Sequence, residues 1–266
     1  MAGKLLPDDL WNEIERLFPE YEPSPDGGRP PKTARAVLTA ILFVLKTGLA
    51  WEDLPSEAFG VSYKTCLRRI DEWTEIGVWQ QMHELFLAKL RAADVLDWSR
   101  VLVDTSFVKA PLGGEKTGPN PTDRGKSGSK HCLLTDANGT PLVVETAAAN
   151  QHDGATLLPL VVALPAVTGK PGRPKRLPAQ LLADKAFDDQ AIRAVLRWLG
   201  IEPEIPHRGD SEHGLGKLRW FVERTLSWFH QFRRLKIRWD RRPEVHQAFL
   251  SLAAALICYR LWINEF

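Results

Sequence analysis

Cysteine is scarce in this chain of 266 residues, and its three cysteines, Cys66, Cys132 and Cys258, stand far apart. Because no Cys-x-x-Cys pair occurs, we expect neither a disulfide framework nor a cysteine-based zinc site, and a reducing cytosol suits the composition. The longest uncharged apolar run, Ala248–Tyr259, has twelve residues. A membrane span needs about 20, so this run predicts a buried helix. Met1–Asp8 contains no signal-peptide-like apolar run, and we therefore expect a cytoplasmic protein with no membrane partner.

A large net charge is also missing. The 35 Lys and Arg residues oppose 33 Asp and Glu residues, and the resulting +2 gives no overall hint of nucleic-acid binding. The balance conceals an asymmetry, since residues 1–100 carry 12 basic and 16 acidic side chains (−4) while residues 101–266 carry 23 and 17 (+6). Such an uneven distribution indicates two regions with different tasks.

The first hundred residues have apolar side chains at helical spacing. Helices are predicted at Pro7–Phe18, Thr33–Lys46, Trp51–Leu54, Val61–Trp73 and Gly77–Arg91. A helix, a short helix, a small-residue turn and a basic helix in this order are typical of a helix-turn-helix. We therefore expect a helical DNA-binding domain over residues 1–97, in which Lys64, Arg68 and Arg69 contact DNA. The alternative is a small helical bundle with a solvated basic face.

After Trp98 the pattern changes to β-strands separated by helices, over a predicted second domain of residues 98–266. Strands are predicted at Arg100–Lys109, Lys130–Asp136, Pro141–Thr146, Gln180–Asp184 and Ile201–Pro206, and helices at His152–Leu164, Asp188–Leu199, Lys217–Arg234 and Glu244–Trp262. The order β-β-β-α-β-α-β-α predicts a mixed α/β sheet flanked by helices, with an antiparallel hairpin portion and a parallel crossover portion. This architecture is a ribonuclease H-like core.

Three carboxylates stand in apolar surroundings: Asp104 within a strand, Asp184 at the end of another, and Glu223 on a long helix. Buried carboxylates are costly unless they are paired or bind metal. If the first and fourth strands are parallel neighbours, Asp104 and Asp184 can meet, with Glu223 reaching them from the packed helix. Three hard oxygen donors favour Mg²⁺ or Mn²⁺ over zinc, and two such ions could support phosphoryl transfer.

Each acid also has a purely structural alternative. Asp104 could be a turn residue at a strand end, Asp184 could cap the following turn, and Glu223 could pair with Arg219 one turn earlier on the helix. The coincidence of all three at matching places in one fold favours the metal site.

The segments VDTSFVKA, DRGKSGSKHCLLTDANGTPL, LLADKAFDD and RWFVERTLSWFHQFRRL contain these acids and their surroundings. Together they resemble the DDE transposases of bacterial insertion sequences, specifically the insertion sequence five family. The resemblance implies that Asp104, Asp184 and Glu223 form the catalytic, metal-binding triad. It also implies cleavage at the terminal inverted repeats of a transposon, joining of the freed 3′-OH to target DNA, and action as at least a dimer on DNA. A bacterial cytoplasmic, nucleoid-associated protein is expected.

Related enzymes carry a Tyr-Arg-Glu-Lys signature around the last acid. In this sequence Arg219 and Glu223 match its second and third positions, whereas Gly216 and His230 stand where tyrosine and lysine are expected. The roles of these two positions are left open.

Basic residues near the acids are candidates for contact with DNA phosphates. Those on the signature helix and beyond it are Arg219, Arg224, His230, Arg234 and Lys236, and those near the second strand are Lys126 and Lys130. Arg173, held between glycine and proline as Arg29 is, could enter a minor groove. The alternatives are a solvated helix face and a flexible basic linker.

Three functions remain open at this point. The leading one is a Mg²⁺-dependent transposase. A ribonuclease H-like nuclease would use the same acids without strand transfer, although it would not need the helix-turn-helix. A DNA-binding regulator derived from a transposase would need no intact triad, yet all three acids are present.

Overall fold

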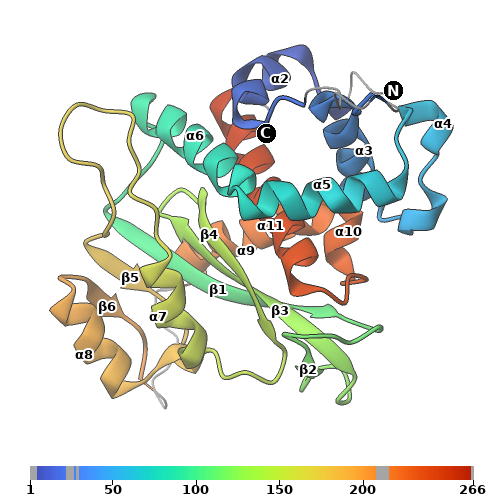
Figure 1. Ribbon diagram of the computed structural model, residues 1–266. Helices are drawn as coiled ribbons and strands as arrows, with labels where there is room; N and C mark the ends of the chain where they lie inside the picture. The colour runs from blue at the N-terminus through green and yellow to red at the C-terminus, as the bar shows by residue number, and fades with distance from the viewer. Residues whose placement is uncertain (1–4, 22–26, 28–29, 208–215, 265–266) are drawn as a thin grey trace.

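A computed structural model describes residues 5–21, 27, 30–207 and 216–264, together with side chains except those of residues 216–218. A layer of helices lies over one end of a mixed β-sheet, and further helices flank the sheet (Figure 1). The chain forms the helical layer first, then the sheet, and returns to the helical layer with its last helix.

The N-terminal helices follow the predicted order. They are α2 (Asp8–Ile14), η1 (Glu15–Leu17), α3 (Ala34–Thr47), η2 (Trp51–Asp53), α4 (Ser56–Phe59), α5 (Tyr63–Glu75) and α6 (Val78–Ala92). Side-chain caps fix where two of them begin, since Thr33 accepts the Ala36 N–H and Ser62 accepts the Thr65 N–H. Helix α3 ends at Gly48, whose φ of 71° belongs to the left-handed region that suits glycine. Helix α4 was not predicted, because four residues are too few to show a helical period.

The sheet has the predicted ribonuclease H-like connectivity. Its strands are β1 (Arg100–Lys109), β2 (Gly118–Pro119), β3 (Ser127–Asp136), β4 (Pro141–Ala148), β5 (Gln180–Leu182) and β6 (Glu202–Glu204). The order is β2-β3-β1-β5-β6, with β4 also paired to β3. Strands β1, β3 and β4 are antiparallel, whereas β5 runs parallel to β1 and β6 parallel to β5. The predicted parallel neighbours are confirmed, with Leu102 opposite Leu182.

Helices cover both faces of this sheet. They are α7 (Gly154–Val162), η3 (Lys185–Phe187), α8 (Gln190–Trp198), α9 (Gly216–Gln231), α10 (Arg233–Lys236) and α11 (Pro243–Trp262). Successive side chains of a strand point to opposite faces. Asp104 faces Arg219 of α9, whereas Thr105 donates its hydroxyl to Asp153 at the start of α7. Helices α9 and α7 therefore lie on opposite faces of β1.

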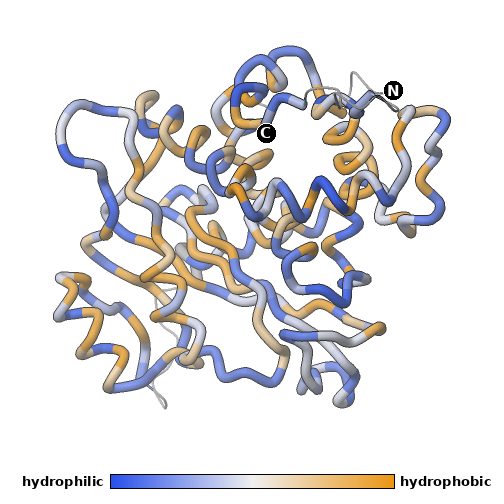
Figure 2. Tube along the Cα trace, in the orientation of Figure 1, coloured by the Kyte–Doolittle hydropathy of each residue, from blue (hydrophilic) through white to orange (hydrophobic). Residues whose placement is uncertain are grey.

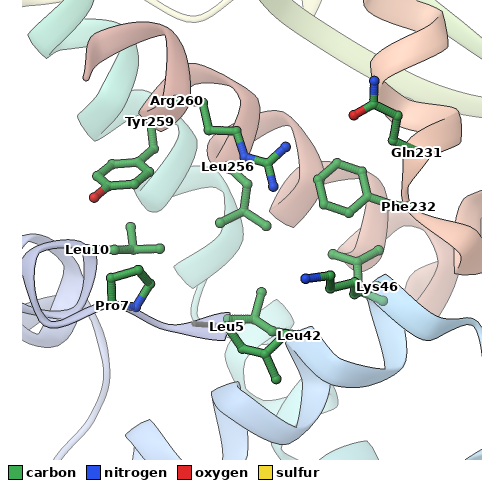
Figure 3. Close-up of a pocket in the computed structure, with 11 residues that line it drawn as sticks. Leu5, Pro7, Leu10, Leu42, Lys46, Gln231, Phe232, Leu256, Tyr259 and Arg260 are labelled. Carbon is green, nitrogen blue, oxygen red and sulfur yellow. The ribbon is translucent and has the colours of Figure 1, made fainter. Parts of the chain in front are cut away.

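The N-terminal helices and the sheet region that follows them share one hydrophobic core. Helix α11 packs against α5, α6 and β4, and α10 packs against α3. A cavity of about 260 Å³ between α2, α3 and α11 is lined from both regions, and the long side chains of Lys46 and Arg260 border it (Figure 3). The division at residues 97 and 98 stays a prediction, and by its packing α11 belongs to the helical layer.

A buried polar network strengthens this junction. Arg234 donates two hydrogen bonds to Asp240, at 2.7 and 3.0 Å, and a third to the Leu49 carbonyl at 2.9 Å. The Trp51 indole donates to the same Asp240 carboxylate at 3.2 Å. The end of α3 is thereby fixed to the corner between α10 and α11.

By length and composition alone, helix α11 is long and apolar enough to cross a membrane. However, 72% of its most apolar window is buried inside the protein. Figure 2 shows apolar segments gathered between the helical layer and the sheet. This is the core helix that the apolar run Ala248–Tyr259 predicts.

Candidate active site

Asp104 lies in the middle of β1 rather than at its end, so the turn interpretation of this residue is wrong. Its side chain is 15% exposed, and its Oδ1 accepts the Thr105 N–H at 2.8 Å. On one edge Asp104 is paired with Leu133 of β3, and on the other edge the pairing with β5 ends two residues earlier, at Leu102. A carboxylate is thus fixed at the centre of the sheet.

Asp184 lies two residues after the end of β5 and reaches the same region. Its Oδ1 accepts the Ala186 N–H at 2.8 Å and caps η3, which is the structural role that the sequence suggested. Its Oδ2 lies 3.9 Å from Arg219 Nη2. One oxygen therefore orients the side chain while the other faces the site.

Glu223 comes from α9, one helical turn after Arg219, and its Oε1 lies 3.7 Å from Arg219 Nη2. The same nitrogen lies 4.0 Å from Asp104 Oδ2. The structure therefore brings the three predicted acids together around one guanidinium, at distances of 3.7–4.0 Å.

The pKa of Asp104 is raised to about 6, mainly by burial and to a smaller extent by the negative charges of Asp184 and Glu223. The Thr105 N–H and the Arg219 guanidinium act in the opposite direction. Burial outweighs both, because it penalises the charged carboxylate. The site therefore favours the approach of a further positive charge.

In the described parts of the chain, no group of three His, Cys, Asp or Glu side chains is arranged as a ready metal cage. Around Asp104 the carboxylates face Arg219 instead. Their chemistry nevertheless fits a hard divalent cation, since oxygen donors suit Mg²⁺ and Mn²⁺. The convergence of three carboxylates on one cationic group shows that positive charge is stabilised at this position.

The hairpin turn between β3 and β4 anchors α9. The Arg224 guanidinium donates to the Asn138 carbonyl at 2.6 Å, and the Thr225 hydroxyl donates to the Gly139 carbonyl at 2.5 Å. Gly139 has a φ of +85°, and a Cβ there would lie 2.9 Å from the Phe221 carbonyl oxygen. The turn thus holds the two residues that follow Glu223 on α9.

Arg224 is consequently half-buried and engaged within the protein. Its guanidinium also stacks near two indole rings, 4.7 Å from the Trp220 centroid and 4.5 Å from the Trp228 centroid. These contacts favour an anchoring role on α9, although the sequence predicted contact with DNA.

Two polar residues, Ser106 of β1 and His230 of α9, lie next to the acids. Ser106, two residues after Asp104 and on the same face, lies 3.3 Å from His230 Nε2. Burial lowers the pKa of His230, and the nearby Lys236 charge lowers it further. Sequence reasoning missed Ser106, although its spacing of two from Asp104 within a strand was a usable signal.

Five of the predicted DNA-contacting side chains are exposed: Lys64, Arg68, Lys126, Arg173 and Lys236. Lys64 and Arg68 share one face of α5, since they are four residues apart. Arg29, the counterpart of Arg173 in the other Gly-Arg-Pro segment, lies outside the described residues.

The structure corrects the prediction for Arg69, Lys130 and Arg234, because all three are buried. Arg69 pairs with Glu72 and covers the Tyr21 ring, 3.3 Å from its centroid. Lys130 pairs with Asp153 at 2.6 Å on the α7 face of the sheet. Arg234 belongs to the Asp240 network described above, so none of the three is available to DNA phosphates.

The structure combines a ribonuclease H-like sheet with three carboxylates that surround Arg219. This combination is typical of enzymes that act on phosphodiesters. Comparisons with known proteins narrow the class. Residues 97–258 match the family described as "Transposase DDE domain", and residues 6–83 match "Putative transposase of IS4/5 family". The chain belongs to the DDE transposase family.

Two proteins of Burkholderia cepacia are similar to this chain. "Putative transposase for insertion sequence element IS402" is 52% identical over 149 residues, which cover 55% of this chain and 70% of that protein. "Insertion element IS402 uncharacterized 16.2 kDa protein" is 50% identical over 123 residues, which cover 46% and 84%. The catalytic domain of Mos1 mariner transposase aligns at 13% identity over 70% of this chain and 91% of that one, with a TM-score of 0.27 that is too low to bear on the fold.

Proposed function

We propose that this transposase binds the terminal inverted repeats of its element, cleaves the DNA at the transposon ends and joins the resulting 3′-OH to target DNA. The observation that carries the proposal is the convergence of Asp104, Asp184 and Glu223 within 4.0 Å of one nitrogen of Arg219. Three separate elements, β1, the end of β5 and α9, supply these acids.

Asp104, Asp184 and Glu223 would hold two Mg²⁺ ions, for which Mn²⁺ could substitute. When bound, such ions supply a clamp on the attacking and leaving oxygens of an in-line phosphoryl displacement. Asp104 provides the most buried carboxylate, whose ionised form gains most from a neighbouring cation. The Thr105 and Ala186 N–H groups orient Asp104 and Asp184, and the hairpin turn holds the helix of Glu223.

Arg219 would neutralise the acids before DNA and metal arrive and then be free to contact a phosphate. Exposed Lys64 and Arg68 on α5 would bind the repeats, supported by the position of α5 after a short helix and turn. The protein would act in the bacterial cytoplasm, at the nucleoid, as a dimer or larger assembly on paired ends.

The test uses the full-length protein with duplexes that carry the terminal inverted repeats flanking its gene, together with Mg²⁺ and a target plasmid. Joined products with short direct duplications at the insertion site support the proposal. Cleaved ends without joined products would identify a nuclease instead, and binding without cleavage would identify a DNA-binding regulator.

A further inference from the structure

One edge of β1 is open at the level of Asp104. Pairing with β5 ends at Leu102, and the next bridge on this edge joins Lys109 to Ile237. Within the described residues, Asp104 and Thr105 are therefore paired with β3 alone. An open strand edge leaves backbone groups without a ladder partner, and here the Thr105 N–H donates to Asp104 Oδ1 at 2.8 Å. The orientation of the Asp104 carboxylate thus depends on how firmly Thr105 is held.

Thr105 is held from the far face of the sheet. Successive side chains of a strand alternate between the two faces, so Thr105 points toward α7 while Asp104 points toward α9. The Thr105 hydroxyl donates to Asp153 Oδ1 at 3.3 Å, at the start of α7. Two hydrogen bonds of one residue therefore connect the carboxylate of Asp104 with that of Asp153, across the sheet.

Lys130 in turn fixes the Asp153 carboxylate. It lies on β3 opposite Phe107 and so shares the face of Thr105. Its side chain is only 2% exposed, and its Nζ lies 2.6 Å from Asp153 Oδ1. The same ammonium donates to the Gln151 carbonyl. Lys130 is thereby bonded to two acceptors in the segment that leads into α7, and this leaves Asp153 little freedom to move.

Stability alone does not account for this buried pair. Removing two charges from water costs about as much as their attraction returns, and apolar side chains of similar volume often stabilise a core equally well. The Asp153 side chain also forms no capping hydrogen bond to α7 in the described part of the chain. Its carboxylate bonds instead to Lys130 and to Thr105, the residue that orients Asp104.

We propose that Thr105, Asp153 and Lys130, named here the cross-sheet chain, are positioning residues that hold the Asp104 carboxylate in the orientation needed for cleavage. The proposal rests on the proposed function and adds these three residues to it. Thr105 acts through its N–H, and Asp153 and Lys130 act through Thr105. The sequence placed Lys130 among the DNA contacts, and the cross-sheet chain gives it a different task on the opposite face of the sheet from the acids.

The test compares Thr105→Val with Thr105→Ser in the full-length protein. Valine keeps the branched shape and the backbone N–H but loses the hydroxyl, whereas serine keeps the hydroxyl. The single-turnover rate of Mg²⁺-dependent cleavage is measured on a saturated terminal-repeat duplex, together with the Kd for that duplex. We expect Thr105→Val to lower the rate about tenfold at an unchanged Kd, because a misplaced catalytic group costs rate rather than binding. Thr105→Ser should restore the wild-type rate.

Thr156→Val is the matched control. The Thr156 hydroxyl donates to the backbone carbonyl of the same Asp153 at 2.7 Å, and the Thr156 N–H keeps that carbonyl bonded when the hydroxyl is lost. This variant deletes a hydroxyl beside Asp153 without touching the cross-sheet chain, and it should cleave at the wild-type rate.

A second set of variants separates positioning from stability. Lys130→Met leaves Asp153 without its cation and should lower the urea midpoint of unfolding, whereas Lys130→Met/Asp153→Leu removes both charges and should recover the midpoint. Cleavage by the double variant should stay about tenfold below the wild type. Adding Thr105→Val to it should lower the rate no further, because residues that act through one contact are not additive.

Three results would each overturn the proposal: a wild-type rate in Thr105→Val, an equal loss in Thr156→Val, or recovery of cleavage together with stability in Lys130→Met/Asp153→Leu. Absence of cleavage by the wild-type protein would instead contradict the proposed function.

Discussion

Arg219, in helix α9, places its Nη2 4.0 Å from Oδ2 of Asp104 in the middle of strand β1. The same nitrogen faces Asp184 and Glu223, so one guanidinium partly neutralises three carboxylates. This arrangement leads to an expectation about metal affinity.

Arg219→Gln should tighten the binding of Mn²⁺ or Mg²⁺ to the DNA-free protein. A positive charge about 4 Å from the ligands opposes a second cation by up to about 4 kcal/mol, and solvent screening at this partly exposed site reduces the effect. We expect about a tenfold gain in affinity by calorimetric titration, while Arg197→Gln leaves it unchanged. Weaker metal binding in Arg219→Gln would show that the guanidinium assists the site.

Substitutions of exposed and of buried basic residues on helix α5 should have different effects, the first on DNA binding and the second on stability. Lys64→Ala/Arg68→Ala removes two exposed charges and should weaken binding to the terminal repeats without changing the unfolding temperature. Arg69→Met should instead lower the free energy of unfolding by about 1–3 kcal/mol, because Arg69 is buried against Tyr21 and Glu72. Unchanged affinity in the double variant would count against α5 as the recognition helix.

The anchor of α9 should contribute to both stability and cleavage. Thr225→Val deletes a buried hydroxyl that donates to the Gly139 carbonyl, and should cost about 1–2 kcal/mol in denaturant unfolding. Cleavage should fall as well, since Glu223 loses a neighbouring support. Thr47→Val, whose hydroxyl bonds to Phe43 within α3, is the matched control and should leave cleavage unchanged.

Two buried histidines should make the fold sensitive to acid. His131 and His246 contact each other through their Nε2 atoms at 2.9 Å. Burial lowers the pKa of His246 to about 3, with help from the Arg238 and Arg234 charges, and burial also lowers the pKa of His131. Because the unfolded chain binds protons more readily, stability is complete above about pH 6.5 and is lost as the pH falls toward 3.

The loss from His246 should amount to about 4 kcal/mol. Urea unfolding at a series of pH values measures it, and His131→Leu/His246→Leu should flatten the dependence between pH 6.5 and 4. An equally steep loss in the double variant would assign the acid sensitivity to other groups.

The fold and the acid cluster were predictable from the sequence because both depend on local patterns. Alternating and periodic apolar residues placed the strands and helices, and three carboxylates interrupting apolar runs marked the site. The burial of Arg69 could also have been predicted. This residue lies three positions after Cys66 and four before Trp73, on the buried stripe of α5.

The burial of Lys130 and Arg234 could not be predicted, because it depends on tertiary contacts that do not show in the local sequence pattern. Strand β3 is buried on both faces, so it lacks the alternation that would have assigned Lys130 a side, and its partner Asp153 follows a different strand. Arg234 was predicted to continue the signature helix. The chain instead leaves helical geometry at Phe232, which turns Arg234 inward to Asp240.

The central claim is that Asp104, Asp184 and Glu223 perform DNA cleavage together. The direct measurement is Mg²⁺-dependent cleavage of a terminal-repeat duplex by Asp104→Asn, Asp184→Asn and Glu223→Gln, alongside Asp189→Asn. Asp189 is a nearby exposed helix cap, and asparagine caps a helix equally well. The account predicts a loss of at least about 1,000-fold, or about 4 kcal/mol, in each acid variant, with end binding and the Asp189→Asn control unchanged. Cleavage within tenfold of the wild-type rate in any of the three acid variants would contradict it.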